Sequence, residues 1–179
     1  MTADRPSRPS ELETEAIEVV PPERSATAIG VKRLLQALAF VWVLPRLAIY
    51  GLSSPVLGRE RAFANASEGV GRVPGLRGLY LRQAFYRSTL AACGRDVYFG
   101  WLSAFSTPEA RVGERAYVGR RCGLGRVTLG EDVMLADGAQ ILSGARQHGR
   151  GGDRVHRESP QEYRRVSIGE GAWIGAGAV

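Results

Sequence analysis

The sequence predicts an all-β solenoid preceded by an α-helical N-terminal region, and three observations support that prediction. The chain has 179 residues, the length of one ordinary domain with a tail. Glycine is in excess, with 23 residues, of which 14 follow Arg111. A six-residue pattern begins at the same point of the chain, and each of its units contains one aliphatic residue. Short strands joined by tight turns at fixed spacing produce such a pattern.

Eight aliphatic residues define the repeat, and in all eight cases the residue two places before is small or β-branched. The aliphatic residues are Val112, Val118, Leu124, Leu129, Leu135, Ile141, Ile168 and Ile174, and glycine follows six of them. The preceding small or β-branched residues are Ala110, Ala116, Cys122, Val127, Val133, Ala139, Val166 and Ala172. No single hexapeptide can bury its aliphatic side chain, so successive coils must stack around one continuous core. We expect the glycines to relieve the turns.

Composition divides the chain into three parts. Residues 1–30 hold six acidic residues and four prolines but no aromatic residue, which is typical of a disordered acidic tail. Residues 31–96 are expected to be helical, and the repeat occupies residues 97–179 with a loop excursion at 143–165. The two cysteines are too few for a disulfide framework, so we expect free thiols and a cytoplasmic protein.

The charge of the chain is basic, with a formal net charge of +6. Of the 24 basic residues, 23 are arginine, a skew that we attribute to codon bias, and we expect no nucleic-acid partner. The tail carries three basic against six acidic residues, so residues 31–179 carry +9. That balance favours an anionic surface or ligand.

Residues 34–57 form an apolar stretch with two open interpretations. A simple transmembrane helix needs about 20 clean apolar residues. Here Pro45 is expected to kink the helix, and Arg46 lies near its centre. A helix in the membrane interface or a bent re-entrant segment fits better, and would place the protein at the inner face of the plasma membrane. The other interpretation is a helix packed against the protein or across an oligomer interface.

The repeat resembles that of the hexapeptide-repeat acyltransferases, and is similar to the maltose, galactoside and xenobiotic O-acetyltransferases. The resemblance implies a left-handed parallel β-helix with three hexapeptides in each coil. It also implies acetyl-CoA as acyl donor, no metal, and a homotrimer with its active site between subunits. In these enzymes a loop with a catalytic histidine lies where this chain has its excursion, and His148 matches that histidine. Trp173 and Ala176 match positions that line the coenzyme A groove.

The chemistry of acetyl transfer explains why a histidine is expected at position 148. The acceptor hydroxyl must lose a proton as it attacks the thioester, and an imidazole titrates near neutral pH. His156, the only other histidine, lies among charged residues in the middle of the excursion and is expected at the surface. Trp173 has a second interpretation, as an outer residue that covers the base of the loop. We expect an O-acetyltransferase that modifies a saccharide, such as a cell-surface polysaccharide precursor.

The chain departs from the resemblance at two points. Sugar acetyltransferases use an asparagine at the acceptor site, but the only asparagine here, Asn65, lies outside the repeat. The chain also ends at Val179 in mid-repeat, so we expect it to be truncated. The alternative function is a non-catalytic β-helix scaffold or subunit. A γ-type carbonic anhydrase is disfavoured because its zinc needs three histidines and the chain has two.

Overall fold

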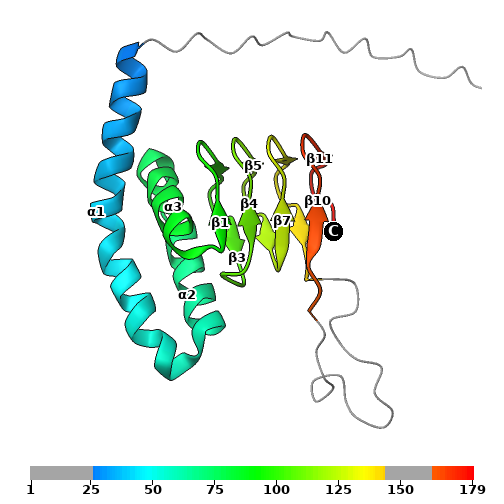
Figure 1. The fold of residues 1–179 in the computed structure, drawn as a ribbon, viewed down its shortest axis with the longest axis horizontal. Coiled ribbons are helices and arrows are strands. Elements are labelled where there is room, and N and C mark those ends of the chain that lie inside the picture. Colours follow the sequence, from blue (N-terminus) through cyan, green and yellow to red (C-terminus); the bar gives the residue numbers. More distant parts are fainter. Residues whose placement is uncertain (1–25, 144–162) are drawn as a thin grey trace, which may run out of the picture.

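The protein has a three-helix region followed by a parallel β-solenoid, which confirms the predicted fold class (Figure 1). The computed structural model describes residues 26–143 and 163–179. Residues 1–25 of the predicted tail and most of the predicted excursion lie outside the described residues. Residues 26–30, which we assigned to the tail, begin the first helix.

The described residues form three helices, α1 (Ala26–Leu57), α2 (Arg59–Gly71) and α3 (Gly75–Thr89). The predicted apolar stretch, residues 34–57, is therefore part of one α-helix, which contains Pro45 and Pro55. One side of α1 packs on the other two helices, where Tyr50 makes edge contacts with Phe63 and Phe85 at 6.0 and 6.5 Å between ring centroids. These tertiary contacts stabilise α1, although prolines are unfavourable inside an α-helix.

The solenoid contains short strands that form three parallel sheets in the described residues. The sheets have the orders β1-β4-β7-β10, β2-β5-β8-β11 and β3-β6-β9, so each complete coil gives one strand to each sheet. The strands are β1 (Ala92–Cys93), β2 (Tyr98–Phe99), β3 (Ala104–Phe105), β4 (Arg111–Val112), β5 (Tyr117–Val118), β6 (Gly123–Leu124), β7 (Val127–Leu129), β8 (Met134–Leu135), β9 (Gln140–Ile141), β10 (Val166–Ile168) and β11 (Trp173–Ile174).

The strand register confirms the aliphatic ladder that the repeat predicts. In one sheet Val112 pairs with Leu129, and Leu129 pairs with Ile168. The other two sheets align Val118, Leu135 and Ile174, and Leu124 with Ile141. The first coil starts at Ala92, five residues before the start expected near residue 97, because Cys93 takes an aliphatic position opposite Val112.

The glycines that follow the aliphatic residues serve a different purpose from the one we expected. A Cβ atom on Gly113 would lie 2.5 Å from the carbonyl carbon of Gly130 on the next coil, so this glycine allows close stacking. The left-handed backbone needed for the turns occurs instead three residues after the aliphatic position. Gly138, Gly171 and Gly177 occupy such positions, and so do non-glycine residues, namely Asp96, Leu102, Arg115, Arg121 and Asp132.

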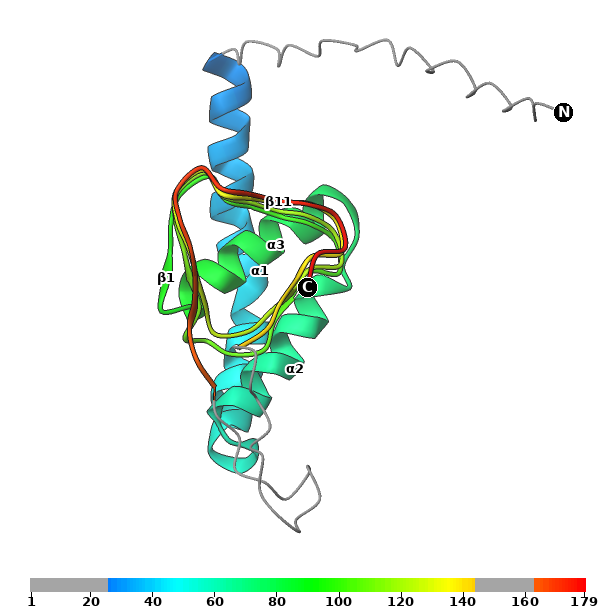
Figure 2. The same ribbon diagram turned by 90° about the vertical axis from the view of Figure 1, so that its right-hand side faces the viewer.

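The helices close the N-terminal end of the solenoid. Figure 2 views the solenoid along its axis and shows α3 crossing behind the stacked coils. Arg82 of α3 is buried, and its guanidinium donates to the carbonyl oxygens of Phe99 (3.0 Å) and Val73 (2.8 Å). Burial lowers the pKa of Arg82. Through these contacts the helices cover the apolar end of the first coil, and the hydrogen-bonding groups buried there have partners.

Candidate functional site

A groove of about 430 Å³ lies between α2 and the outer face of sheet β3-β6-β9. The sheet contributes a ladder of Ala104, Gly123 and Gln140, which are aligned from coil to coil. The first two are small, so they leave a hollow that larger side chains would fill. Ala64 and Glu68 of α2 form the opposite wall, and the remaining lining includes Ser106, Leu142, Ser143 and Tyr163.

Both ends of the predicted excursion meet at the rim of this groove. The N–H of Arg164 donates to the carbonyl oxygen of Ser143 at 3.0 Å. The buried Ser143 hydroxyl in turn accepts the N–H of Arg126 at 2.8 Å. Tyr163, on the returning side, is 46% exposed and lines the groove. The excursion therefore starts and ends beside the groove.

Two further contacts fix the base of the excursion. A Cβ atom on Gly125 would lie 2.3 Å from the Ser143 hydroxyl oxygen, so only glycine leaves room for the serine there. On the returning side, Nη1 of Arg165 donates to the carbonyl oxygen of Glu109 at 2.9 Å and lies 3.4 Å from that of Val127. This arginine is thus held against earlier coils by its backbone partners.

The predicted base, His148, and the second histidine, His156, lie outside the described residues. His148 is the fifth residue after Ser143 in the sequence. The structure therefore places the root of the segment that carries both histidines, but it does not describe either imidazole.

Trp173 and Ala176, which we expected to contact coenzyme A, lie on or beside a different sheet from the groove. Trp173 is 72% exposed on the outer face of sheet β2-β5-β8-β11, in register with Met134. Ala176 is exposed in the turn after β11. Two residues later the carbonyl oxygen of Ala178 accepts the N–H of Gln140, a groove residue, at 2.8 Å. Ala176 is therefore two residues from Ala178, which contacts the groove residue Gln140.

The outer face around Trp173 is a ladder of large side chains. Tyr98 and Tyr117 stack there with ring centroids 4.7 Å apart and an angle of 4° between planes. Met134 continues the ladder and is 50% exposed. Such an exposed row of flat and flexible side chains suits contact with another surface or a long ligand.

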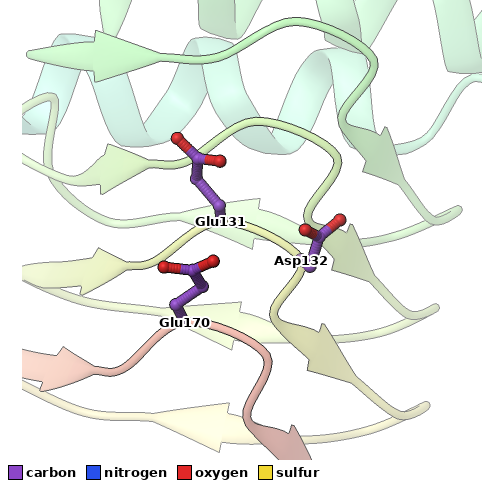
Figure 3. A group of neighbouring side chains, drawn as sticks. All are labelled: Glu131, Asp132 and Glu170. Carbon is purple, nitrogen blue, oxygen red and sulfur yellow. The ribbon is translucent and has the colours of Figure 1, made fainter.

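A cluster of three carboxylates occupies one corner of the solenoid (Figure 3). Glu131, Asp132 and Glu170 have oxygen atoms within 4.8 Å of one another and are all exposed. Arg115 pairs with Asp132 at 2.6 Å and with Glu131 at 3.3 Å. The hydrogen bond from Arg115 lowers the pKa of Asp132. Because the guanidinium of Arg115 already pairs with two of the three carboxylates, we interpret this cluster as part of the solenoid surface and not as a metal site.

Sequence reasoning missed the groove itself. Glu68 and Ala64 lie far from the repeat in the sequence, and packing of α2 beside β3 brings them to the sheet. Gln140 and Gly123 belong to the repeat, but their outward position alone did not indicate a hollow. The signal that was available is the run of small outward residues, Ala104 and Gly123, on successive coils.

Comparison of the chain with protein-family models, with curated proteins and with solved structures finds no match. The fold assignment therefore rests on the three interleaved sheets, whose strands recur about every six residues and are consistent with a parallel β-helix.

Proposed function

We propose that the protein is an acyltransferase that moves an acetyl group from acetyl-CoA to a hydroxyl of a saccharide, with His148 as the general base. The groove at the root of the excursion is the observation that carries this proposal. An extended residue spans at most about 3.5 Å, so the five residues after Ser143 keep His148 within about 17 Å of the groove wall. The resemblance to left-handed hexapeptide-repeat acyltransferases supports the same site.

The proposed reaction needs few groups. His148 accepts the proton of the acceptor hydroxyl while the hydroxyl oxygen attacks the thioester carbonyl carbon. Backbone N–H groups of the turns stabilise the negative oxygen of the tetrahedral intermediate. The carbon–sulfur bond then breaks, and coenzyme A leaves as a thiol after it takes the proton from the imidazolium. Acetyl-CoA is the acyl donor, and no metal takes part in this scheme.

The position of Trp173 supports a site that is shared between copies of the chain. Trp173 and the groove lie on different faces of one solenoid. In a homotrimer, the exposed ladder of one copy faces the groove of a neighbour, so that Trp173 and Ala176 contact the pantetheine arm there. A trimer is also what the resemblance implies. The protein acts in the cytoplasm, where acetyl-CoA is made available.

A coenzyme A release assay with acetyl-CoA and a panel of saccharides and amines tests the proposal. His148→Ala is expected to lower turnover by at least about 100-fold, the usual contribution of a general base. His156→Ala is the matched control, because it removes an equal side chain from the same segment, and it should keep turnover within about threefold. Equal turnover of the wild type and His148→Ala would remove the histidine from the mechanism. Absence of both turnover and acetyl-CoA binding would leave a non-catalytic scaffold.

A further inference from the structure

Helix α1 presents a broad apolar face away from the rest of the described protein. This outer face comprises Leu34, Leu38, Val41, Trp42, Ile49 and Leu52, each between 48% and 79% exposed. The opposite side of the helix, with Ala39 and Val43, is buried against the other helices. Apolar patches of this extent on a protein surface mark contact with a partner or a membrane.

The width of the apolar surface on α1 distinguishes a lipid from a helical partner. At 100° for each residue, the exposed apolar side chains from Phe40 around to Leu35 cover about 220° of the helix. A helix that packs on a protein buries a stripe of about 100°. One neighbouring helix from a second copy would therefore leave about half of this surface in water. A bilayer covers all of it.

The charges along α1 complement an anionic surface. The helix contains no Asp or Glu. Of its three cations, Lys32 pairs with Asp96 on the inner side, and Arg33 and Arg46 are exposed. A groove of about 310 Å³ opens between α1 and α3, with Leu35, Trp42 and Leu76 in its lining and Arg77 beside them. An acyl chain matches the apolar lining, and a lipid phosphate matches the arginine. Cations beside a membrane are attracted to its anionic lipids.

The contacts of the inner side decide how the helix lies. By length and composition alone, residues Gly30–Leu57 are apolar enough to cross a membrane: an 18-residue window within them has a mean hydropathy of 1.5, and 11% of that window is buried. However, Lys32 pairs with Asp96 of the first coil, and Tyr50 packs on Phe63 of α2. A spanning α1 would pull these charged and folded elements into hydrocarbon, at a high cost. The helix must therefore lie parallel to the membrane.

We propose that the outer face of α1 docks flat on an anionic lipid bilayer and that the solenoid stands on the membrane end-on. Figure 1 shows the basis for this orientation, since the coils stack away from α1 and β11 lies at the opposite end. Neighbouring coils are about 4.8 Å apart, so the fourth coil with Trp173 lies about 14 Å beyond the first. This proposal does not depend on the acyltransferase activity.

Vesicle flotation tests the docking. The full chain is mixed with phosphatidylcholine vesicles that contain either no anionic lipid or about one third phosphatidylglycerol. It is expected to float with both, and several-fold more strongly with the anionic vesicles. Leu38→Glu/Leu52→Glu should weaken the partition by at least about tenfold, since carboxylates are excluded from the acyl boundary. Ala92→Glu/Ser167→Glu is the matched control, because it adds two carboxylates at exposed strand positions outside α1.

Tryptophan quenching by brominated lipids tests the orientation without charge substitutions. Trp101→Phe/Trp173→Phe leaves Trp42 as the reporter, which should be quenched and blue-shifted on vesicles. Trp42→Phe/Trp101→Phe leaves Trp173, which should stay unquenched. Equal quenching of both would overturn the end-on orientation. Failure to float, or equal floating of the Leu38→Glu/Leu52→Glu variant, would overturn the docking. Lipid-free oligomers that bury Trp42 would assign the face to a second copy instead.

Discussion

Stacking of the coils depends on glycines at the position after each aliphatic residue, and Gly113 gives the sharpest test. A Cβ atom there would lie 2.5 Å from the Gly130 carbonyl carbon and 2.6 Å from the Glu131 nitrogen. Ordinary contact needs at least about 3.4 Å, so Gly113→Ala must push two coils apart by about 0.9 Å. Gly169 holds the equivalent place after Ile168, yet nothing lies within 4 Å of its added Cβ.

The expected loss of stability follows from this displacement. The N–H of Gly113 donates to the Leu129 carbonyl oxygen at 2.8 Å, and the N–H of Asp132 donates to that of Glu114 at 3.0 Å. Lengthening both by about 0.9 Å takes them beyond hydrogen-bond range, at about 1 kcal/mol each. Overpacking adds about 1–3 kcal/mol. Gly113→Ala should therefore destabilise the fold by about 3–5 kcal/mol.

Equilibrium urea unfolding, followed by circular dichroism, measures the difference. Gly169→Ala meets no atoms and restricts the unfolded chain, so it should be neutral or more stable by up to about 1 kcal/mol. The two variants carry the same chemical change, which isolates the effect of the neighbouring coil. Losses below about 1 kcal/mol for Gly113→Ala, or equal losses for both variants, would refute the role assigned to these glycines.

Three other predictions concern the cap, a thiol and the groove. The Tyr86 hydroxyl lies 2.9 Å from Ser67 Oγ, so Tyr86→Phe and Ser67→Ala should each cost about 1–3 kcal/mol in urea unfolding, and the double variant about 0.5–1.5 kcal/mol less than their sum. Burial raises the pKa of Cys93 from 9.0 to about 11. At pH 8 the thiolate fraction of Cys93 should therefore be about 100-fold lower than in the urea-unfolded chain, and the rate at which iodoacetamide alkylates it should fall by the same factor. A Cβ on Gly123 would lie 2.2 Å from Gln140 Oε1, so Gly123→Ala should raise the acceptor KM by about tenfold while unfolding stays near wild type; an unchanged KM would place the acceptor elsewhere.

The core of the solenoid was predictable because its signal is local and repeated. From Val112 onward, each unit of the repeat has one inward aliphatic residue with a small or β-branched neighbour two places before it, and the parallel pairings follow from that spacing. The first coil was harder to recognise, since Cys93 replaces the aliphatic residue. Val112 is seven positions after Phe105, and Leu129 is five positions after Leu124, so a strict six-residue period fails at both steps.

The backbone of the turns was not predictable from composition. Left-handed φ angles occur at Leu102, Arg115 and Arg121, residue types that give no signal for such a conformation. For a non-glycine residue this region costs about 1 kcal/mol or more. The hydrogen bond from the Arg121 N–H to the Trp101 carbonyl oxygen, at 2.9 Å, helps to offset that cost. Contacts between coils, which are distant in sequence, therefore decide the turn geometry.

The candidate site was predictable only as a segment. The break in the repeat after Ile141 indicated an excursion, and the structure puts both of its ends at one groove. The second wall of the groove comes from α2, whose position is set by tertiary contacts such as that of Ser67 Oγ with the Phe105 N–H at 2.9 Å. No local pattern in residues 59–71 encodes that contact. Long-range packing completes the site.

Membrane docking and the groove are coupled through α2, which packs on α1 and lines the groove with Ala64 and Glu68. A helix is about 10–12 Å across and α2 lies between α1 and the groove, so the groove lies about two helix diameters from the lipid-facing side of α1. That height suits a saccharide that is itself attached to a lipid. If both proposals hold, vesicles that display the acceptor saccharide on a lipid should show a KM at least about tenfold below that of the free saccharide, since both reactants share one surface.

The variant Leu38→Glu/Leu52→Glu separates the two contributions. It should abolish the advantage of the lipid-linked acceptor while leaving turnover of the free saccharide unchanged. Both positions lie on the outer face of α1, and neither lines the groove beside α2, although Leu38 lines the separate groove between α1 and α3. Ala92→Glu/Ser167→Glu should keep the advantage. Equal KM values for free and lipid-linked acceptors in the wild type would show that the groove draws its acceptor from solution. In that case the membrane would serve to localise the protein and not to present its substrate.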